Sequence, residues 1–204
     1  MFKRRLRDID NPQFRLCGLL LLTAFGLVGS AIALAAQSAG ADAFAVQDVN
    51  SAAGRQFETV AHLSAMGVAA VIIIASVFVH YEALRLLSVI AKRIPIKPRA
   101  RVMIGIFYIV ILHFIEIWFF AFGFVYLDGV KAFGKLAGMG HEGIMEYVYF
   151  SAVCYSTLGF GDIVPEGPLR LLCAAEALLG LIMITWSASY TYLQMQRHWH
   201  PDRD

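Results

Sequence analysis

The apolar residues of this chain are gathered into long runs, and these runs predict its main elements. A helix that crosses a bilayer needs about 20 mostly apolar residues. Four runs reach that length: residues 16–36, 59–79, 102–127 and 169–194. The second contains only one titratable residue, His62, and continues as an amphipathic stretch to residue 91. The pattern therefore predicts four transmembrane helices.

A fifth apolar segment, residues 144–156, lies between the last two runs. It is too short to cross a bilayer, and non-helical backbone at membrane depth is tolerated only where protein or a water-filled cavity surrounds it. We therefore expect a re-entrant pore helix over residues 143–156, followed by a loop. The predicted fold is an all-α integral membrane protein.

Composition agrees with this fold class. The 204 residues are 59% hydrophobic and only 16% charged, whereas soluble domains are about 45–50% apolar and about 25% charged. The formal net charge of +2 is too small to indicate a nucleic-acid partner. The lipid bilayer is the expected environment.

The positions of the basic residues predict the orientation. They cluster before the first span, between the second and third spans, and after the fourth, whereas the other two connections hold few. The positive-inside rule then places both termini and the 92–101 loop in the cytoplasm, and residues 37–56 and 128–168 outside. We expect a multi-pass protein of the plasma membrane. The basic residues on the cytoplasmic side are Lys3, Arg4, Arg5, Arg7, Arg15, Lys92, Arg93, Lys97, Arg99, Arg101, Arg197 and Arg203.

The first span admits a second interpretation. A basic start, an apolar run and small residues near position 35 are also typical of a cleavable signal peptide. Asp8 and Asp10 within the basic segment, and the length of the apolar run, favour a retained helix. Cleavage would leave the orientation of the other three spans unchanged.

The cytoplasmic loop contains Pro95 and Pro98, and these prevent a continuous helix because proline lacks an N–H and restricts the preceding residue. The loop is predicted to form a stiff elbow. Its basic residues act as topology determinants, or alternatively contact anionic lipid headgroups. The candidate lipid contacts are Lys92, Arg93, Lys97, Arg99 and Arg101.

The segment after the predicted pore helix has the properties of an ion pathway. A dehydrated cation needs carbonyl oxygens from successive residues that point at one axis. Successive carbonyls point the same way when the backbone alternates between right- and left-handed conformations, and glycine adopts the left-handed one without steric cost. Thr157 can add a hydroxyl ligand and Asp162 a carboxylate at the mouth. The segment consists of Thr157, Leu158, Gly159, Phe160, Gly161 and Asp162.

This segment resembles the potassium-channel signature Thr-Val-Gly-Tyr-Gly-Asp, and the order of the surrounding elements is similar to that of the family. Residues 102–194 would supply an outer helix (102–127), a pore helix (143–156), a filter (157–162) and an inner helix (169–194). Tyr149-Phe150-Ser151 resembles the aromatic-aromatic-Ser of prokaryotic pore helices, and Gly180 falls near the family's inner-helix hinge.

The resemblance implies that K+ binds at Thr157, Leu158, Gly159 and Phe160. It also implies a homotetramer, since one chain supplies one filter loop. We therefore divide the chain into an N-terminal two-helix region (1–101), a pore module (102–194) and a short cytoplasmic tail (195–204). The two extra helices do not resemble half of a voltage sensor, because neither carries arginines at every third position.

Three positions depart from the family pattern. Leu158 replaces valine, Phe160 replaces tyrosine, and Val153 stands where some relatives hold a carboxylate behind the filter. Phenylalanine lacks the hydroxyl that can tie a filter to a neighbouring pore helix. The strictness of selection for K+ over Na+ is therefore open at this point.

Titratable groups inside membrane spans are candidate functional residues. His113 and Glu116 lie one turn apart in the third span, and Glu176 lies in the fourth. One hypothesis is a polar cluster behind the filter that couples protonation to gating; the other is a buried network that only locks the helices together. His80 and Glu82 are interpreted as interfacial.

Cys17, Cys154 and Cys173 lie in apolar surroundings without metal-ligand spacing or an obvious pairing, so reduced thiols are expected. The sequence thus predicts a passive K+ channel subunit without a cofactor, K+ being the permeant ion, and not an enzyme. The alternatives are a weakly selective monovalent cation channel and a non-conducting membrane sensor or scaffold.

Overall fold

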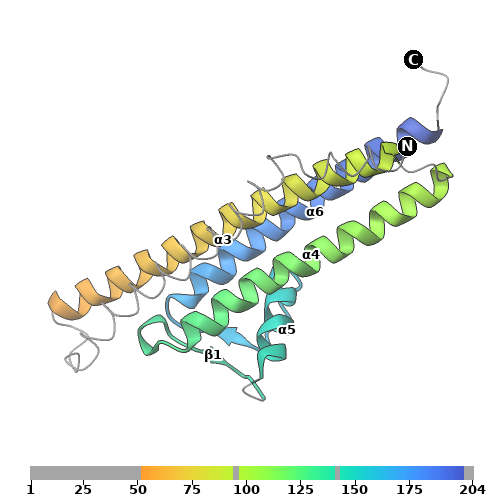
Figure 1. Ribbon diagram of the computed structural model, residues 1–204. Coiled ribbons are helices and arrows are strands. Elements are labelled where there is room, and N and C mark those ends of the chain that lie inside the picture. Colours follow the sequence, from red (N-terminus) through yellow and green to blue (C-terminus); the bar gives the residue numbers. More distant parts are fainter. Residues whose placement is uncertain (1–51, 94–96, 141–142, 200–204) are drawn as a thin grey trace, which may run out of the picture.

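The structure is a computed structural model that describes residues 52–93, 97–140 and 143–199. Three long helices dominate it and lie side by side (Figure 1). The first predicted span, residues 16–36, lies outside the described residues. In chain order the elements are α3 (Ala52–Arg93), α4 (Pro98–Asp128), the 3-10 helix η1 (Lys131–Phe133), β1 (Leu136–Ala137), α5 (Ile144–Tyr155), β2 (Val164–Pro165) and α6 (Leu169–Trp199).

The three long helices correspond to three of the four predicted spans. Within them, the stretches Glu58–Ala91, Arg99–Asp128 and Leu169–Gln196 are long and apolar enough to cross a membrane. Proline is tolerated in the first helical turn because its missing N–H has no partner there, and α4 begins at Pro98 after an extended Lys97. The chain is a mainly helical membrane protein.

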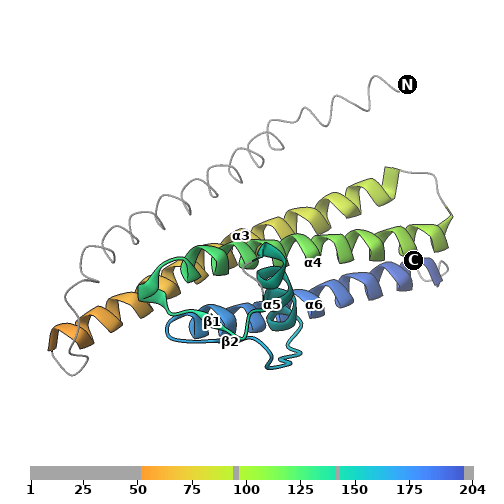
Figure 2. The same cartoon turned by 90° about the horizontal axis from the view of Figure 1, so that it is seen from below.

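The short helix α5 lies between α4 and α6 near one end of the bundle and packs against both (Figure 2). Its 12 residues, Ile144–Tyr155, agree with the predicted range 143–156. The end of α4, the start of α6 and the start of α3 all lie toward that end (Figure 1). The segment between α5 and α6 is therefore held at this end of the molecule.

A small antiparallel sheet, absent from the sequence-based prediction, joins the two connections around α5. Leu136 pairs with Pro165 and Ala137 with Val164. The turn that follows β1 passes very close to the backbone of Asp162. At Gly138 (φ +96) an added Cβ atom would collide with the carbonyl oxygen of Asp162. The sheet therefore ties the chain before α5 to the chain after the candidate filter.

The core lies around α5. Phe124 of α4 and Phe150 of α5 meet edge to face with ring centroids 4.9 Å apart, a favourable geometry for aromatic pairs. Leu169 and Leu172 at the start of α6 are fully buried in the same cluster. A smaller cluster of Leu84, Leu87 and Ile109 joins α3 to α4 farther along the bundle. The larger of the two described clusters of buried residues therefore includes α5, the helix that precedes the candidate filter.

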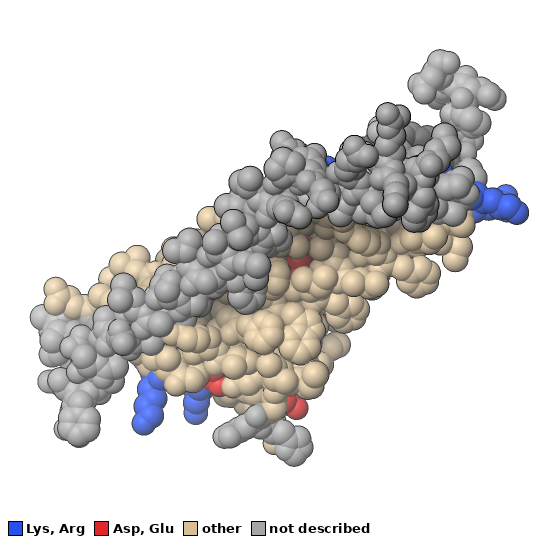
Figure 3. Space-filling model, viewed as in Figure 1, with Lys and Arg blue, Asp and Glu red and all other residues tan. Residues whose placement is uncertain are grey.

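Outside this core the long helices expose large apolar side chains, as expected of surfaces that face lipid or neighbouring subunits. Examples are Ile74, Phe107, Ile111 and Leu178. In Figure 3, Lys and Arg side chains project near the two ends of the described helices, and the face between them shows mainly uncharged residues.

Candidate functional site

The candidate filter begins as the cap of α5. The N–H of Leu158 donates to the carbonyl of Val153 (3.1 Å), and the N–H of Thr157 donates to that of Cys154 (2.9 Å). This pair of bonds is a Schellman motif, in which the residue after the helix cap takes the left-handed conformation. Thr157 does so with φ +60, although glycine is usual there and a β-branched residue is strained. The capping motif of α5 and the candidate filter therefore share two residues, Thr157 and Leu158.

The backbone of the segment alternates in handedness. The angle φ is positive at every second residue: +60 at Thr157, +58 at Gly159 and +79 at Gly161. Leu158 and Phe160, between them, have negative φ. The two glycines behave as the sequence predicts, and the alternation is the one that a row of aligned carbonyls requires. Thr157 as a third left-handed residue was not predicted.

The segment lies on the surface of the single chain. Leu158 and Phe160 are 62% and 66% exposed, and apart from the adjoining residues no atom of the described residues lies within 4 Å of a Cβ placed on Gly159 or Gly161. In an isolated chain the backbone of residues 158–161 is therefore exposed on the surface. Large apolar side chains flank it.

Asp162 at the end of the segment is held by two donors. The hydroxyl of Tyr149 on α5 donates to Oδ2 (2.6 Å), and the N–H of Ile163 donates to Oδ1 (3.0 Å). The Tyr149 hydrogen bond, and after it the backbone bonds, hold the pKa of the Asp162 carboxyl below its usual value. The same hydrogen bond to Asp162 raises the pKa of Tyr149. Sequence analysis expected Asp162 to supply a carboxylate at the mouth but did not identify Tyr149 as its partner.

A second site, a buried polar network, lies behind the filter and centres on Glu116. Its carboxylate oxygens lie 2.8 Å from Nδ1 of His80 and 3.1 Å from Nδ1 of His113, and the hydroxyl of Tyr155 donates to it. Nε2 of His80 lies 3.2 Å from the hydroxyl of Ser187. A carboxylate can only accept hydrogen bonds, so the arrangement assigns a proton to Nδ1 of His80. The network joins α3, α4, α5 and α6.

His80 corrects one interpretation. It is fully buried, with the indole ring of Trp186 5.2 Å from its ring, rather than interfacial. The ligating atoms of His80, His113 and Glu116 lie within 4.8 Å of one another, but the two carboxylate oxygens are already engaged by hydrogen bonds. We therefore describe the group as a hydrogen-bonded network.

Glu176 lies outside this network. Its Oε1 accepts a hydrogen bond from Ser151 of α5, whose hydroxyl also lies 2.8 Å from the carbonyl of Ile117. Its other oxygen, Oε2, is buried without a hydrogen-bond partner among the described residues. The structure thus brings His113 and Glu116 together as predicted, and directs Glu176 to a separate contact between α5 and α6.

Gly180 of α6 lies against the end of α5. A Cβ atom there would collide with the carbonyl oxygen of Tyr155, and no flexible side chain is involved that could move away. The resemblance to the potassium-channel family suggested this position as a hinge, and nothing in the structure tests that role. The structure adds a steric reason for glycine, because it lets the inner helix touch the backbone that precedes the filter.

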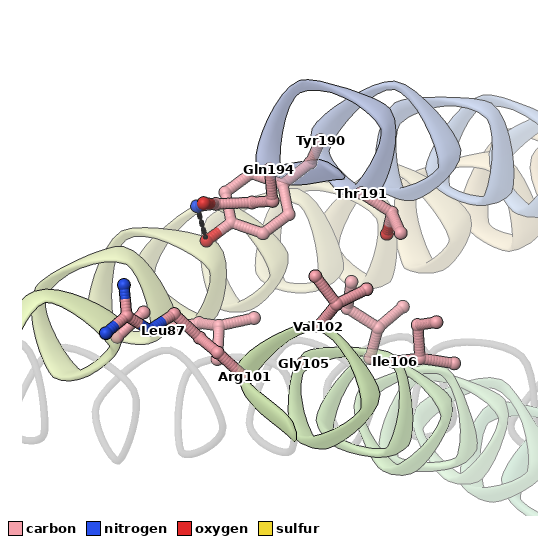
Figure 4. A pocket seen from close by; sticks show the side chains of 10 residues that line it. Leu87, Arg101, Val102, Gly105, Ile106, Tyr190, Thr191 and Gln194 are labelled. Carbon is pink, nitrogen blue, oxygen red and sulfur yellow. Dashed lines mark hydrogen bonds between the residues drawn. The ribbon is translucent and has the colours of Figure 1, made fainter. Parts of the chain in front are cut away.

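A pocket lies between α3, α4 and α6 at the end of the bundle away from α5 (Figure 4). Gln194 donates to the hydroxyl of Tyr190 beside it (2.9 Å), and Tyr190 also contacts Ser88 (2.9 Å). Among the candidate lipid contacts, Arg101 lines this pocket. Lys97 and Arg99, which are close to Arg101 in the sequence, are exposed. The side chains of Lys92 and Arg93 are not among those that the structure describes.

Comparison with known families found a match over part of the chain, which includes the candidate filter and Glu116 but not His80. Residues 110–197 match a family model described as "Ion channel". No curated protein and no solved structure matches the chain. The matched residues include most of α4, all of α5, the candidate filter and most of α6.

Proposed function

We propose that this chain, whose residues 110–197 are an ion-channel domain, is the subunit of a passive K+-selective channel. The observation that carries the proposal is the alternation of φ over Thr157, Gly159 and Gly161. Such a ribbon can turn its carbonyls to one side, and rings of carbonyls replace the hydration shell of K+. The proposed K+ ligands are in Thr157, Leu158, Gly159 and Phe160, and Asp162 stands at the mouth.

The proposed assembly is a homotetramer. One chain supplies one wall of a filter, and the exposure of Leu158 and Phe160 on the single chain is what a surface completed by neighbouring subunits would present. In the membrane, α5 would form a re-entrant pore helix whose C-terminal end faces the ion path. That end of a helix carries partial negative charge, which favours a cation.

Reversal potentials test selectivity. The full chain, reconstituted into planar bilayers with a K+ gradient opposed to a Na+ gradient, should give currents that reverse near the equilibrium potential of K+. Equal permeation of both ions would instead establish a weakly selective cation channel. Absence of current across varied pH, voltage and lipid composition would favour the non-conducting scaffold. Native mass spectrometry of the same sample should give four times the subunit mass.

We further propose that the Glu116 network couples protonation to gating. Tyr155, two residues before the filter, connects the network to the end of α5, and Ser187 connects it to α6. The titratable groups that face Glu116 are His80 of α3, His113 of α4 and Tyr155 of α5. Histidine is the side chain whose charge changes most readily near neutral pH, so a proton gained here would alter contacts to three helices at once.

The pH profile of open probability tests this coupling. Glu116→Gln removes the charge while keeping the shape of the side chain, and it should flatten or shift the profile between pH 5 and 8. The matched control is His62→Gln, because His62 is an exposed histidine on α3, the helix that carries His80, and its described hydrogen bond joins only the backbone carbonyl of Glu58. Identical profiles in the native chain and in Glu116→Gln would reduce the network to a structural role.

A further inference from the structure

Two cysteine side chains meet between the pore helix and the inner helix. Cys154 is the second-last residue of α5 and Cys173 lies in the second turn of α6. Their Sγ atoms are 2.8 Å apart. In a disulfide bond this distance is about 2.05 Å, so the sulfurs need to approach by less than about 1 Å. Sequence analysis expected no pairing.

The backbone around this pair is firmly positioned. Gly180 brings α6 into contact with the carbonyl of Tyr155, the residue after Cys154. The Tyr155 side chain is buried and anchored to Glu116. Ser151, one turn before Tyr155, bonds Glu176, which follows Cys173 by one turn. Contacts on both sides therefore keep the two sulfurs facing each other.

We propose that Cys154 and Cys173 are a modification site and form a reversible disulfide that links α5 to α6. The loop so closed contains the whole segment 157–162. A small-molecule disulfide is the oxidant: one thiolate attacks it and forms a mixed disulfide, and the second thiolate displaces the remaining half. One sulfur–sulfur bond forms in the protein, one is lost from the oxidant, and two molecules of small thiol leave with the two protons.

Access and location suit this chemistry. Cys154 is buried, but Cys173 is only half-buried, so Cys173 is the thiol that an oxidant reaches first. If the filter faces outward, as the proposed function requires, the pair lies toward the oxidising side of the membrane, where disulfides persist. This last point alone rests on the proposed function; the juxtaposition of the sulfurs does not.

Thiol counting tests the proposal on the full chain in the Cys17→Ser background. One sample is treated with 4,4′-dithiodipyridine and one with a phosphine reductant; each is then denatured, alkylated with N-ethylmaleimide and weighed intact. We expect two labels after reduction and none after oxidation, with the oxidised chain lighter by two hydrogens. Trypsin cleaves after Arg170, so the cysteine peptides should remain joined only in the oxidised sample.

Single substitutions provide the control. Cys154→Ser and Cys173→Ser each leave one thiol, which should be labelled by alkylation or carry a pyridyl adduct, without a link. Two labels on the oxidised pair, two separate pyridyl adducts, or a link between subunits would each overturn the proposal. The readout is chemical, so a non-conducting protein that forms the bond would reject the proposed function and keep this inference.

Ion flux then shows what the bond does. Because the link restrains α5 against α6, oxidation should change the K+ flux of the two-cysteine protein at least twofold, and the phosphine should reverse the change. Neither reagent should alter flux in the Cys154→Ser and Cys173→Ser proteins. A flux that stays constant while the disulfide forms would overturn a regulatory role for the bond.

Discussion

The hydroxyl of Tyr149 donates a 2.6 Å hydrogen bond to Oδ2 of Asp162 and so links α5 to the end of the candidate filter. Phe160 has no hydroxyl for such a tie, and Val153 has no carboxylate. The hydrogen bond between Tyr149 and Asp162, called the brace below, is thus formed within one chain. Tyr149 directly precedes Phe150 of the core. The brace also sets the charge at the mouth, with a consequence for pH.

Tyr149→Phe should make the channel more sensitive to acid. The Tyr149 hydrogen bond is the largest cause of the lowered pKa of Asp162, and a carboxyl group with a lowered pKa stays charged, and keeps its stabilising contact, until pH falls through that value. Without the hydroxyl, the main cause that lowers the pKa of Asp162 is lost, and the pKa rises back toward the ordinary value of an aspartate. The fall in K+ conductance on acidifying the filter side should therefore begin at higher pH.

Single-channel conductance against pH measures this shift. Tyr192→Phe is the control, because Tyr192 is exposed on α6 and bonds only Gln196 through its hydroxyl in the described contacts. Superimposable titrations for the native chain and Tyr149→Phe would contradict the assigned role of the brace.

Gly159→Ala should abolish K+ selectivity with little loss of fold. The residue has φ +58 with no described atom near an added Cβ, so the cost is local and about 1–2 kcal/mol for the left-handed conformation. Relief of that strain would turn a carbonyl away from the row. The reversal potential should therefore shift while the thermal unfolding transition is retained. Gly140→Ala, at an exposed bend without positive φ and with open space around an added Cβ, should change neither.

Gly180→Ala should destabilise the protein. The added methyl group meets a backbone carbonyl, and overpacking of this kind costs about 1–3 kcal/mol. Denaturant unfolding in detergent measures the change. Gly105→Ala on α4 is the control, since its Cβ meets only Leu87 Cδ2 at 3.9 Å, and it should leave stability unchanged or raise it by up to about 1 kcal/mol. Equal stabilities of the two variants would contradict the close contact at Gly180.

His80 and Glu116 should be energetically coupled. A double-mutant cycle with His80→Ala and Glu116→Gln should give a coupling free energy of about 1–3 kcal/mol, because neither group can exchange its partner for water. Glu82 and Arg85 form an exposed ion pair at 3.3 Å on the same helix as His80, and their cycle should give about 0.2–1 kcal/mol. A coupling for the buried pair no larger than that of the exposed pair would show the network to be loose.

The elements that repeat a pattern could be predicted from the sequence. The long apolar runs predicted α3, α4 and α6, and the bounds of α5 differ from the prediction by one residue at each end. The left-handed backbone of Gly159 and Gly161 could be predicted from the residue type alone. Local patterns thus sufficed for the helices and for two residues of the filter.

Contacts between distant residues could not be predicted in the same way. His80 and Glu116 are 36 residues apart and Cys154 and Cys173 are 19 apart, and no local period links them. The two-residue strands β1 and β2 are too short to show an alternation. Thr157 adopts φ +60 because it follows the C-cap of α5 in the Schellman motif, which overrides the preference of its side chain.

The contact between His80 and Glu116 crosses residue 101, where the sequence-based prediction separates a two-helix region from a pore module. A pore cut free of α3 would retain a carboxylate inside the bundle without one of its donors. Residues 102–194 therefore depend on α3 for one hydrogen bond to a buried carboxylate. Grafting it onto another scaffold, or losing α3 in the course of evolution, would require a compensating change at position 116.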